Sequence, residues 1–236
     1  MVSIITCTIR EENMENVFKN YQQQSWKNKE LIIILNKDSM NIDRWINKAK
    51  KYRNVQIYQL LETASLGDCL NFAVMRSNYD IIAKFDDDDY YGTDYIKSSM
   101  DAFKDKNISI IGKSSLYIYF KNTKALIHAS GKENSITDTV AGATLMVRKD
   151  VFHHVRFEKV NRAEDYFFLE ECKKKGFNIY STDCLHFAVI RQDAEKHTWK
   201  ISDKDLMEWG EIIAYTEDFR SLVSNDPRIE NGKLLT

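Results

Sequence analysis

The chain is poor in cysteine and in the residues that interrupt regular structure. Its 236 residues include only 8 glycines, 1 proline and 4 cysteines, and the proline, Pro227, lies close to the end. Collagen-like, proline-rich and glycine/serine-linker proteins are therefore excluded. The cysteines form no C-x-x-C pair or other zinc-finger spacing, so we interpret them as reduced thiols in a cytoplasmic protein.

The chain also lacks long apolar runs and a large net charge. No run approaches the roughly 18 apolar residues of a membrane span, and the chain reaches Arg10 and Glu11 too soon for a signal peptide. The 34 basic and 35 acidic residues give a formal charge of -1, so no global field attracts nucleic acid or an anionic membrane. We therefore expect a cytoplasmic protein without a nucleic-acid partner or a transmembrane segment, with association at the membrane face left open.

Short apolar runs alternate with helical patterns, which predicts strand–helix–strand units on a largely parallel sheet. We expect an α/β fold in a single domain. Strands are predicted at residues 2–8, 31–35, 55–60, 81–85, 109–112, 116–120, 143–147, 178–181 and 187–190. Helices are predicted at residues 14–21, 42–49, 66–74 and 164–175, followed by a last helix through Leu206, Trp209, Ile212 and Ile213 and a frayed polar tail after about Val223.

Four aspartates, Asp86 to Asp89, follow the predicted strand at residues 81–85. Adjacent carboxylates are costly to ionise together because like charges raise one another's pKa, and a divalent cation removes that cost. Side chains alternate along extended backbone, so Asp86 and Asp88 should project to one side, about 6.6 Å apart, and the other two to the opposite side. Open α/β sheets bind ligands at the carboxyl ends of their strands. We therefore predict a magnesium or manganese site for a nucleoside diphosphate rather than a solvated acidic loop.

Several motifs occur in order along the chain. They are Val-Ser-Ile-Ile-Thr-Cys-Thr-Ile-Arg, Glu-Leu-Ile-Ile-Ile-Leu-Asn, Ser65-Leu66-Gly67 with Asn71, Tyr-Asp-Ile-Ile-Ala-Lys-Phe-Asp-Asp-Asp-Asp-Tyr-Tyr, and Ala163-Glu164-Asp165. Together they resemble a family 2 glycosyltransferase of the GT-A fold. The resemblance implies a Rossmann-like, mostly parallel sheet flanked by helices and a smaller mixed sheet on the acceptor side. It also implies a nucleotide-sugar-binding half at 1–112, an acceptor-binding half at 113–222 and a polar C-terminal tail at 223–236.

The resemblance implies a metal and diphosphate site around an Asp-x-Asp element. Asp88 is the expected direct ligand of Mn or Mg, Asp86 shares the metal and lies nearer the ribose, and Asp87 belongs to the nucleotide site. His197 lies in a segment similar to the closing loop of related enzymes and is a candidate metal ligand, although a lone histidine is more often a surface residue. Lys84 either touches the diphosphate or pairs with an aspartate.

The resemblance also implies contacts with the nucleotide. Thr8 and Arg10 follow the first strand, where the family contacts nucleotide, and Gly67 and Asn71 lie where it packs a helix against base and ribose. Many members carry an acidic residue after the second strand, where this chain has Asn36. An asparagine carbonyl accepts the same hydrogen bond from the base N3–H, so UDP or dTDP is the expected donor nucleotide.

Inverting sugar transfer needs a general base that takes the proton of the acceptor hydroxyl. Asp165 resembles the family's base, and a helix start favours a carboxylate; Glu164 is its backup or an acceptor contact. The alternative is that both residues only complement the helix dipole. The segment from Gly142 to Thr144 resembles one that lines the acceptor pocket, and Arg191 is expected to neutralise the leaving group.

These features predict a metal-dependent, inverting glycosyltransferase of the hexosyltransferase type. Its acceptor would be a glycan, a lipid-linked molecule or a protein, in bacterial surface polysaccharide or glycoconjugate synthesis, and its oligomeric state stays open. The alternative is a catalytically lost member that serves as a binding or scaffold protein, because Asn36 and Lys37 depart from the acidic pattern. A nucleotidyltransferase would need a glycine-rich loop after the first strand, and a phosphohydrolase would need Thr or Val close after its nucleophilic aspartate.

Overall fold

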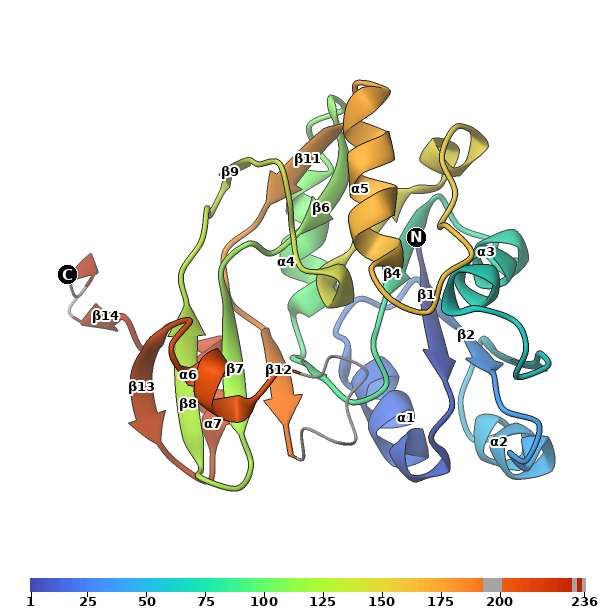
Figure 1. The fold of residues 1–236 in the computed structure, drawn as a ribbon, viewed down its shortest axis with the longest axis horizontal. Helices are drawn as coiled ribbons and strands as arrows, with labels where there is room; N and C mark the ends of the chain where they lie inside the picture. Colours follow the sequence, from blue (N-terminus) through green and yellow to red (C-terminus); the bar gives the residue numbers. More distant parts are fainter. Residues whose placement is uncertain (193–200, 231–232, 235–236) are drawn as a thin grey trace.

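Two sheets form the framework of the computed structural model, which describes residues 1–192, 201–230 and 233–234 (Figure 1). In this part of the chain the first sheet has eight strands, in the spatial order β3 (Val55–Gln59), β2 (Lys29–Leu35), β1 (Val2–Thr8), β4 (Ile81–Lys84), β10 (Met146–Arg148), β6 (Ile108–Gly112), β11 (Asn178–Ser181) and β9 (Ser135–Ile136). The second has five, in the order β13 (Glu211–Tyr215), β8 (Ala125–Ala129), β7 (Leu116–Phe120), β12 (Phe187–Arg191) and β5 (Tyr90–Tyr91). β14 (Ile229–Glu230) and β15 (Lys233–Leu234) form a hairpin.

Helices connect these strands and cover them. The α-helices are α1 (Met14–Gln23), α2 (Ile42–Ala49), α3 (Leu66–Arg76), α4 (Tyr95–Ala102), α5 (Glu164–Lys174), α6 (Asp203–Met207) and α7 (Phe219–Ser224). Short 3-10 turns lie at η1 (Glu11–Asn13), η2 (Gly142–Thr144) and η3 (Lys149–His153). A large, mostly parallel sheet and a smaller mixed sheet are what the sequence analysis predicted.

Strands β3, β2, β1 and β4 run parallel; β2, β1 and β4 are buried on both faces, and β3, at the edge, is partly buried. This is why residues 31–35 are continuously apolar instead of alternating with polar residues. Ile4 and Ile33 pack with α1, α2 and α4 on one face, whereas Ile5 and Ile32 pack with α3 and α5 on the other. Burial on both faces therefore sets the core of the first half.

The order of these strands indicates where a ligand would bind. β1 and β4 are neighbours in the sheet, but the helix after β1 and the helix before β4 lie on opposite faces. The loops leaving the two strands therefore separate at the carboxyl edge, which is where doubly wound sheets bind ligands. Ser65 fixes the start of α3 nearby through a capping box with Asp68.

The second sheet is joined to the first through the aspartate segment. β4 ends at Lys84 in the first sheet, and β5 begins at Tyr90 in the second. The four aspartates span the junction between the two sheets. β5 pairs antiparallel with β12, which itself runs parallel to β7.

Two predicted elements of the second half are wrong. Residues 143–147 do not form one strand, because Thr144 closes the η2 turn through its main-chain N–H and its hydroxyl, both of which donate to the carbonyl of Ala141. The last predicted helix ends at Met207, and Ile212 lies in β13, opposite Ile127 of β8. Apolar residues three apart fit a helix, but the short apolar run at Ile212 and Ile213 fits a strand as well, and pairing with β8 decides the outcome.

The prediction of a frayed tail after Val223 is wrong for residues 226–228. Arg228 donates to Asp226 and to Glu133, and both Asp226 and Arg228 are mostly buried. The tail is polar in sequence because its partners, which lie about a hundred positions earlier, are polar too. Within the described residues, no helix is long and apolar enough to cross a membrane.

Candidate active site at the carboxyl edge of the first sheet

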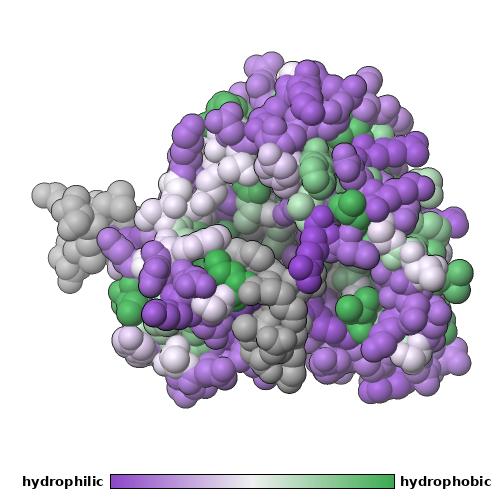
Figure 2. Space-filling view, in the orientation of Figure 1, coloured by the Kyte–Doolittle hydropathy of each residue, from purple (hydrophilic) through white to green (hydrophobic). Residues whose placement is uncertain are grey.

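The four aspartates alternate between exposed and buried, as extended backbone requires. The side chains of Asp86 and Asp88 are 36% and 22% exposed, whereas that of Asp87 is 3% exposed and Asp89 as a residue 6%. Figure 2 shows that this mostly hydrophilic face of the molecule is hollowed near its middle, between the part that carries α1 and the part that carries β13. One pair of carboxylates is therefore partly exposed and the other is buried.

The buried pair fixes the conformation of the loop. The side-chain amide of Asn16 donates to the main-chain carbonyls of Asp87 and Asp89, both at 2.9 Å, and Asn20 donates to that of Asp89 at 2.8 Å. The carboxylate of Asp89 accepts the N–H of Ile190 at 3.0 Å. Sequence reasoning missed Asn16 and Asn20, because asparagines on a helix face give no signal until the loop they hold is known.

Arg10 and Thr8 meet the aspartates from the end of β1. The Arg10 guanidinium binds both carboxylate oxygens of Asp87 and lies 2.8 Å from Asp88 Oδ2. The hydroxyl of Thr8 donates to Asp87. Burial opposes the charge of Arg10, but Asp87 and Asp88 outweigh it and hold its pKa above the usual value. The structure thus brings together Thr8, Arg10, Asp87 and Asp88.

Lys84 pairs with an aspartate, which is one of the two roles considered from the sequence. Its buried ammonium lies 2.5 Å from Asp86 Oδ1. Burial works against the ammonium charge, yet Asp86, Glu164 and Asp165 together raise the pKa of Lys84. Lys84 is therefore a positive charge placed among the donor-side aspartate and the two acidic residues of α5.

The predicted base is held against the same part of the fold. Asp165 lies in the first turn of α5 and approaches Gly142 so closely that a Cβ on Gly142 would clash with its carboxylate. Tyr91 donates to the carbonyl of Ala143 at 2.6 Å and accepts the main-chain N–H of Asp86 at 2.7 Å. Both Asp86 and Asp165 are thus fastened to the η2 turn, one through Tyr91 and the other by direct contact.

Neither tyrosine after the aspartates is free to stack on a sugar, because both are buried. Tyr91 stacks on Phe85, and Tyr90 packs edge-on against Phe219. Glu164 is also buried, and burial raises its pKa while Lys84 opposes the shift. Asp165 is the more accessible of the two acidic residues of α5.

Gly67 and Asn71 contact protein in this structure. A Cβ on Gly67 would clash with the carbonyl of Glu158, and the Gly67 N–H donates to Val160. The amide of Asn71 donates to the carbonyl of Phe157 at 2.8 Å and accepts its N–H at 3.1 Å. Both residues tie α3 to the loop that leads to α5; their predicted contacts with base and ribose stay predictions.

Asn36 and Arg191 are placed at strand ends, as expected. Asn36 follows β2, and its side-chain NH₂ group donates to the carbonyl of Leu61 at 2.8 Å. The side-chain oxygen of Asn36, which is the acceptor of the amide, takes no part in this contact. Arg191 ends β12, is buried, and donates to Asp203 at 3.2 Å and to the carbonyl of Ile201 at 2.7 Å. His197 lies outside the described residues.

The accessible donor set suits a hard cation. Asp86 and Asp88 offer carboxylate oxygens, which Mg²⁺ and Mn²⁺ prefer, and two protein ligands leave positions for water and phosphate oxygens. The residues present therefore fit a divalent ion, and each of the two carboxylates also carries an ion pair in this structure, Asp86 with Lys84 and Asp88 with Arg10.

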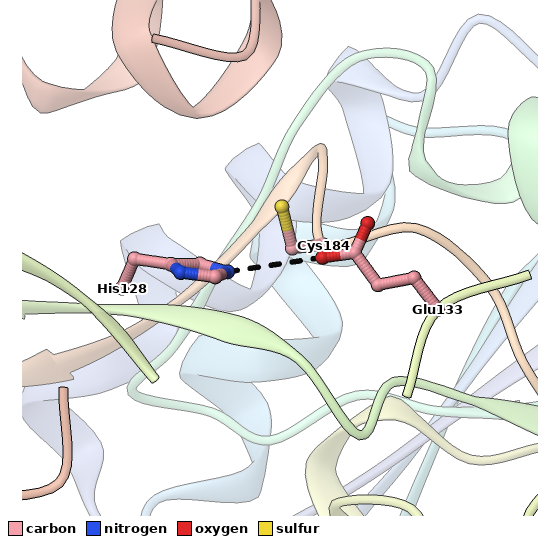
Figure 3. Close-up of side chains that lie close together, drawn as sticks. All are labelled: His128, Glu133 and Cys184. Atoms are coloured by element: carbon pink, nitrogen blue, oxygen red, sulfur yellow. Dashed lines mark ion pairs between the residues drawn. The ribbon is translucent and has the colours of Figure 1, made fainter. Parts of the chain in front are cut away.

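A second group of potential ligands lies beside the second sheet, with His128 on β8 and the others in loops (Figure 3). His128, Glu133 and Cys184 point toward one another, with ligand atoms within 4.8 Å. Arg228 Nη1 lies 2.7 Å from Glu133 Oε1 and 3.0 Å from His128 Nε2, so a guanidinium already supplies positive charge there. Burial, with the charge of Glu133, raises the pKa of Cys184 to about 12, which disfavours the thiolate that a metal needs. We call these four residues the second-sheet cluster.

The family of this chain is decided by sequence comparison. The model of glycosyl transferase family 2 matches residues 3–199, which is most of the chain. The chain belongs to this family. No curated protein matches the chain.

Solved structures share the fold of this family 2 glycosyltransferase. A fragment of S. aureus TarS, residues 1–349, in complex with UDP-GlcNAc has a TM-score of 0.64 at 13% identity, over 81% of this chain and 59% of that one. The mannosyltransferase PcManGT from Pyrobaculum calidifontis, in complex with GDP-Man and Mn²⁺, has a TM-score of 0.60 at 13% identity, over 84% and 58%. The chain thus spans about three fifths of the length of these structures, and the predicted GT-A fold is confirmed.

Proposed function

We propose that this protein is a metal-dependent, inverting glycosyltransferase of the hexosyltransferase type. Its donor would be a UDP- or dTDP-sugar, and its acceptor a hydroxyl of a glycan, a lipid-linked molecule or a protein. The proposal includes a cytoplasmic location and a role in bacterial surface polysaccharide or glycoconjugate synthesis. Structures of the same fold bind UDP-GlcNAc or GDP-Man with Mn²⁺, which supports a nucleotide-sugar donor and a divalent cation.

One observation carries the proposal. Two exposed carboxylates, Asp86 and Asp88, lie at the ligand-binding edge of the sheet, and Asp165 is fastened to the same η2 turn as Asp86. A carboxylate pair for a metal-bound diphosphate and a separate carboxylate for proton transfer are the two parts that inverting transfer needs. Lys84 lies near these groups, and the charges of Asp86, Glu164 and Asp165 raise its pKa.

The reaction assigns a task to each group. Asp165 accepts the proton of the acceptor hydroxyl while that oxygen attacks the anomeric carbon, and the bond from this carbon to the diphosphate oxygen breaks. A single displacement inverts the configuration at the anomeric carbon. A divalent ion held by Asp86 and Asp88 would stabilise the charge of the departing diphosphate. Arg10 contributes fixed positive charge on the same side.

The test separates donor binding from transfer. We expect Asp165→Asn to bind UDP, dTDP or GDP with Mn²⁺ within about threefold of wild type and to lose transfer by about a thousandfold, because general-base catalysis contributes up to this order. Binding is measured by calorimetry and transfer by nucleotide release from sugar donors with a panel of glycan acceptors. Glu171→Gln, an exposed change on the same helix, is the matched control and should keep wild-type activity.

Two outcomes contradict the proposal in different ways. Transfer by Asp165→Asn at near wild-type rate would show that the base assignment is wrong. Absence of metal-enhanced binding of any of the three nucleotides to the wild-type chain would favour a binding or scaffold protein without catalytic activity.

A further inference from the structure

The guanidinium of Arg10 forms ion pairs with two aspartates, Asp87 and Asp88. Its Nε lies 3.1 Å from Asp87 Oδ2 and its Nη2 contacts the other oxygen of Asp87, which makes a two-pronged pair. Its Nη1 lies 2.8 Å from Asp88 Oδ2. One positive charge is thus shared between a buried carboxylate and an exposed one.

The two contacts differ in how firmly they are held. The side chain of Asp87 is buried, and it also accepts the Thr8 hydroxyl. Two-pronged arginine–carboxylate pairs are strong and geometrically specific, and removing a partner from a buried pair is costly. The side chain of Asp88, in contrast, is partly exposed to solvent. The contact between Arg10 and Asp88 can therefore break while the pair with Asp87 keeps the guanidinium in place.

A fixed guanidinium beside Asp88 should weaken the binding of the divalent cation and strengthen the binding of the nucleoside diphosphate. It occupies an oxygen of the expected metal ligand and repels a divalent cation that approaches the same oxygen. The same charge attracts the phosphate oxygens of a nucleoside diphosphate, which guanidinium groups bind well. Lys84 does not take this part, because its ammonium is buried and directed to Asp86.

We propose that Arg10 couples the binding of the divalent cation to the binding of the diphosphate, an inference that rests on the proposed function. Without nucleotide, Arg10 holds Asp88 and keeps metal affinity low. With a diphosphate present, the guanidinium turns one N–H from Asp88 to a phosphate oxygen and the carboxylate becomes available to the cation. The two ligands then enter together, and coupling between binding sites is reciprocal.

The experiment measures each ligand alone in Arg10→Gln. We expect Mn²⁺ alone, followed by the paramagnetic resonance signal of the free ion, to bind about tenfold more tightly than to wild type. We expect UDP, dTDP or GDP without metal, measured by calorimetry, to bind about tenfold more weakly, within the usual range of coupling. Arg53→Gln is the matched control, because it removes the same charge from an exposed arginine at the amino end of β3 and should change neither affinity.

Opposite changes in the two affinities distinguish coupling from damage to the site. Weaker binding of both ligands, or unchanged Mn²⁺ affinity, would overturn the inference. If Arg10→Gln does not fold, Arg10→Lys keeps a charge for Asp87 but cannot span both carboxylates, and it should bind Mn²⁺ alone about threefold more tightly. If the wild-type chain binds no nucleotide at all, the proposed function fails, and the comparison of Mn²⁺ affinities still decides the role of Arg10.

Discussion

The aspartate loop and the second-sheet cluster each place an arginine beside carboxylates, but we propose a metal site only at the loop. In the loop, Asp86 and Asp88 keep exposed oxygens while Arg10 is anchored on the buried Asp87. In the cluster, Arg228 is enclosed by Glu133, Asp226 and the ring of His128. The difference teaches that proximity of potential ligands does not make a metal site; the chemistry of the donors matters as well, because the loop offers carboxylate oxygens whereas the cluster includes a thiol whose pKa is raised by burial.

The largest test of this comparison removes one carboxylate from each region. Asp88→Ala should lower metal-dependent nucleotide binding and turnover by at least about a hundredfold, because the expected direct ligand is lost. Glu133→Gln should leave both within about twofold. Calorimetry with Mn²⁺ and nucleotide measures both variants, and equal losses would mean that the two regions do not differ as described.

The next test concerns stability instead of binding. Arg228→Met leaves Glu133 and Asp226 without their shared partner, and we expect the free energy of unfolding to fall by about 2 kcal/mol. Urea denaturation measures the change. Arg53→Met removes the same charge from an exposed position and should cost no more than about 0.5 kcal/mol. A loss as small as that of the control would show that Arg228 does not anchor the tail.

The smallest expected effect is a pH dependence of the free energy of unfolding that arises from Glu133 in the cluster. Burial opposes the ionised form of Glu133, but the neighbouring His128 and the hydrogen-bonded Arg228 outweigh it, so the pKa of Glu133 lies well below the usual value. A lowered folded-state pKa stabilises the fold above the unfolded value of about 4.3, and this contribution is lost as pH falls toward the folded value.

We therefore expect the stability difference between wild type and Glu133→Gln to shrink on acidification. Between about pH 6 and pH 3 it should fall by about 1 kcal/mol, a modest amount because solvent screens this partly open site. Urea denaturation across the range measures it. A difference that grows toward low pH would reverse the sign and contradict the assigned pKa direction.

The first half of the fold could be predicted from sequence because its signals are local. Residues 2–8 and 42–49 have the bounds that were predicted, and a continuous apolar run such as 31–35 indicates a strand that is buried on both faces. The second half depends on partners that are distant in sequence. Ile212 becomes part of a strand only because β8 offers a free edge, and Arg228 is ordered by Glu133.

The candidate site divides in the same way. The aspartates, the two residues after β1 and the acidic start of α5 are visible as motifs, and the structure brings several of them into contact. The roles of Tyr91 and Asn16 are not visible, because these side chains bind main-chain groups of other segments. Motifs thus locate the chemical groups, whereas the supporting contacts require the folded chain.

Gly142 gives this arrangement a sequence signature of its own. The carboxylate of Asp165 lies where the first carbon of any other side chain at position 142 would be. The approach of the proposed base to the η2 turn is therefore possible only because position 142 carries no side chain. Among relatives, a glycine at this position should accompany a carboxylate as close to the η2 turn as that of Asp165, and a larger residue should accompany one displaced along the axis of α5, so position 142 can be used to sort family members by the position of this carboxylate.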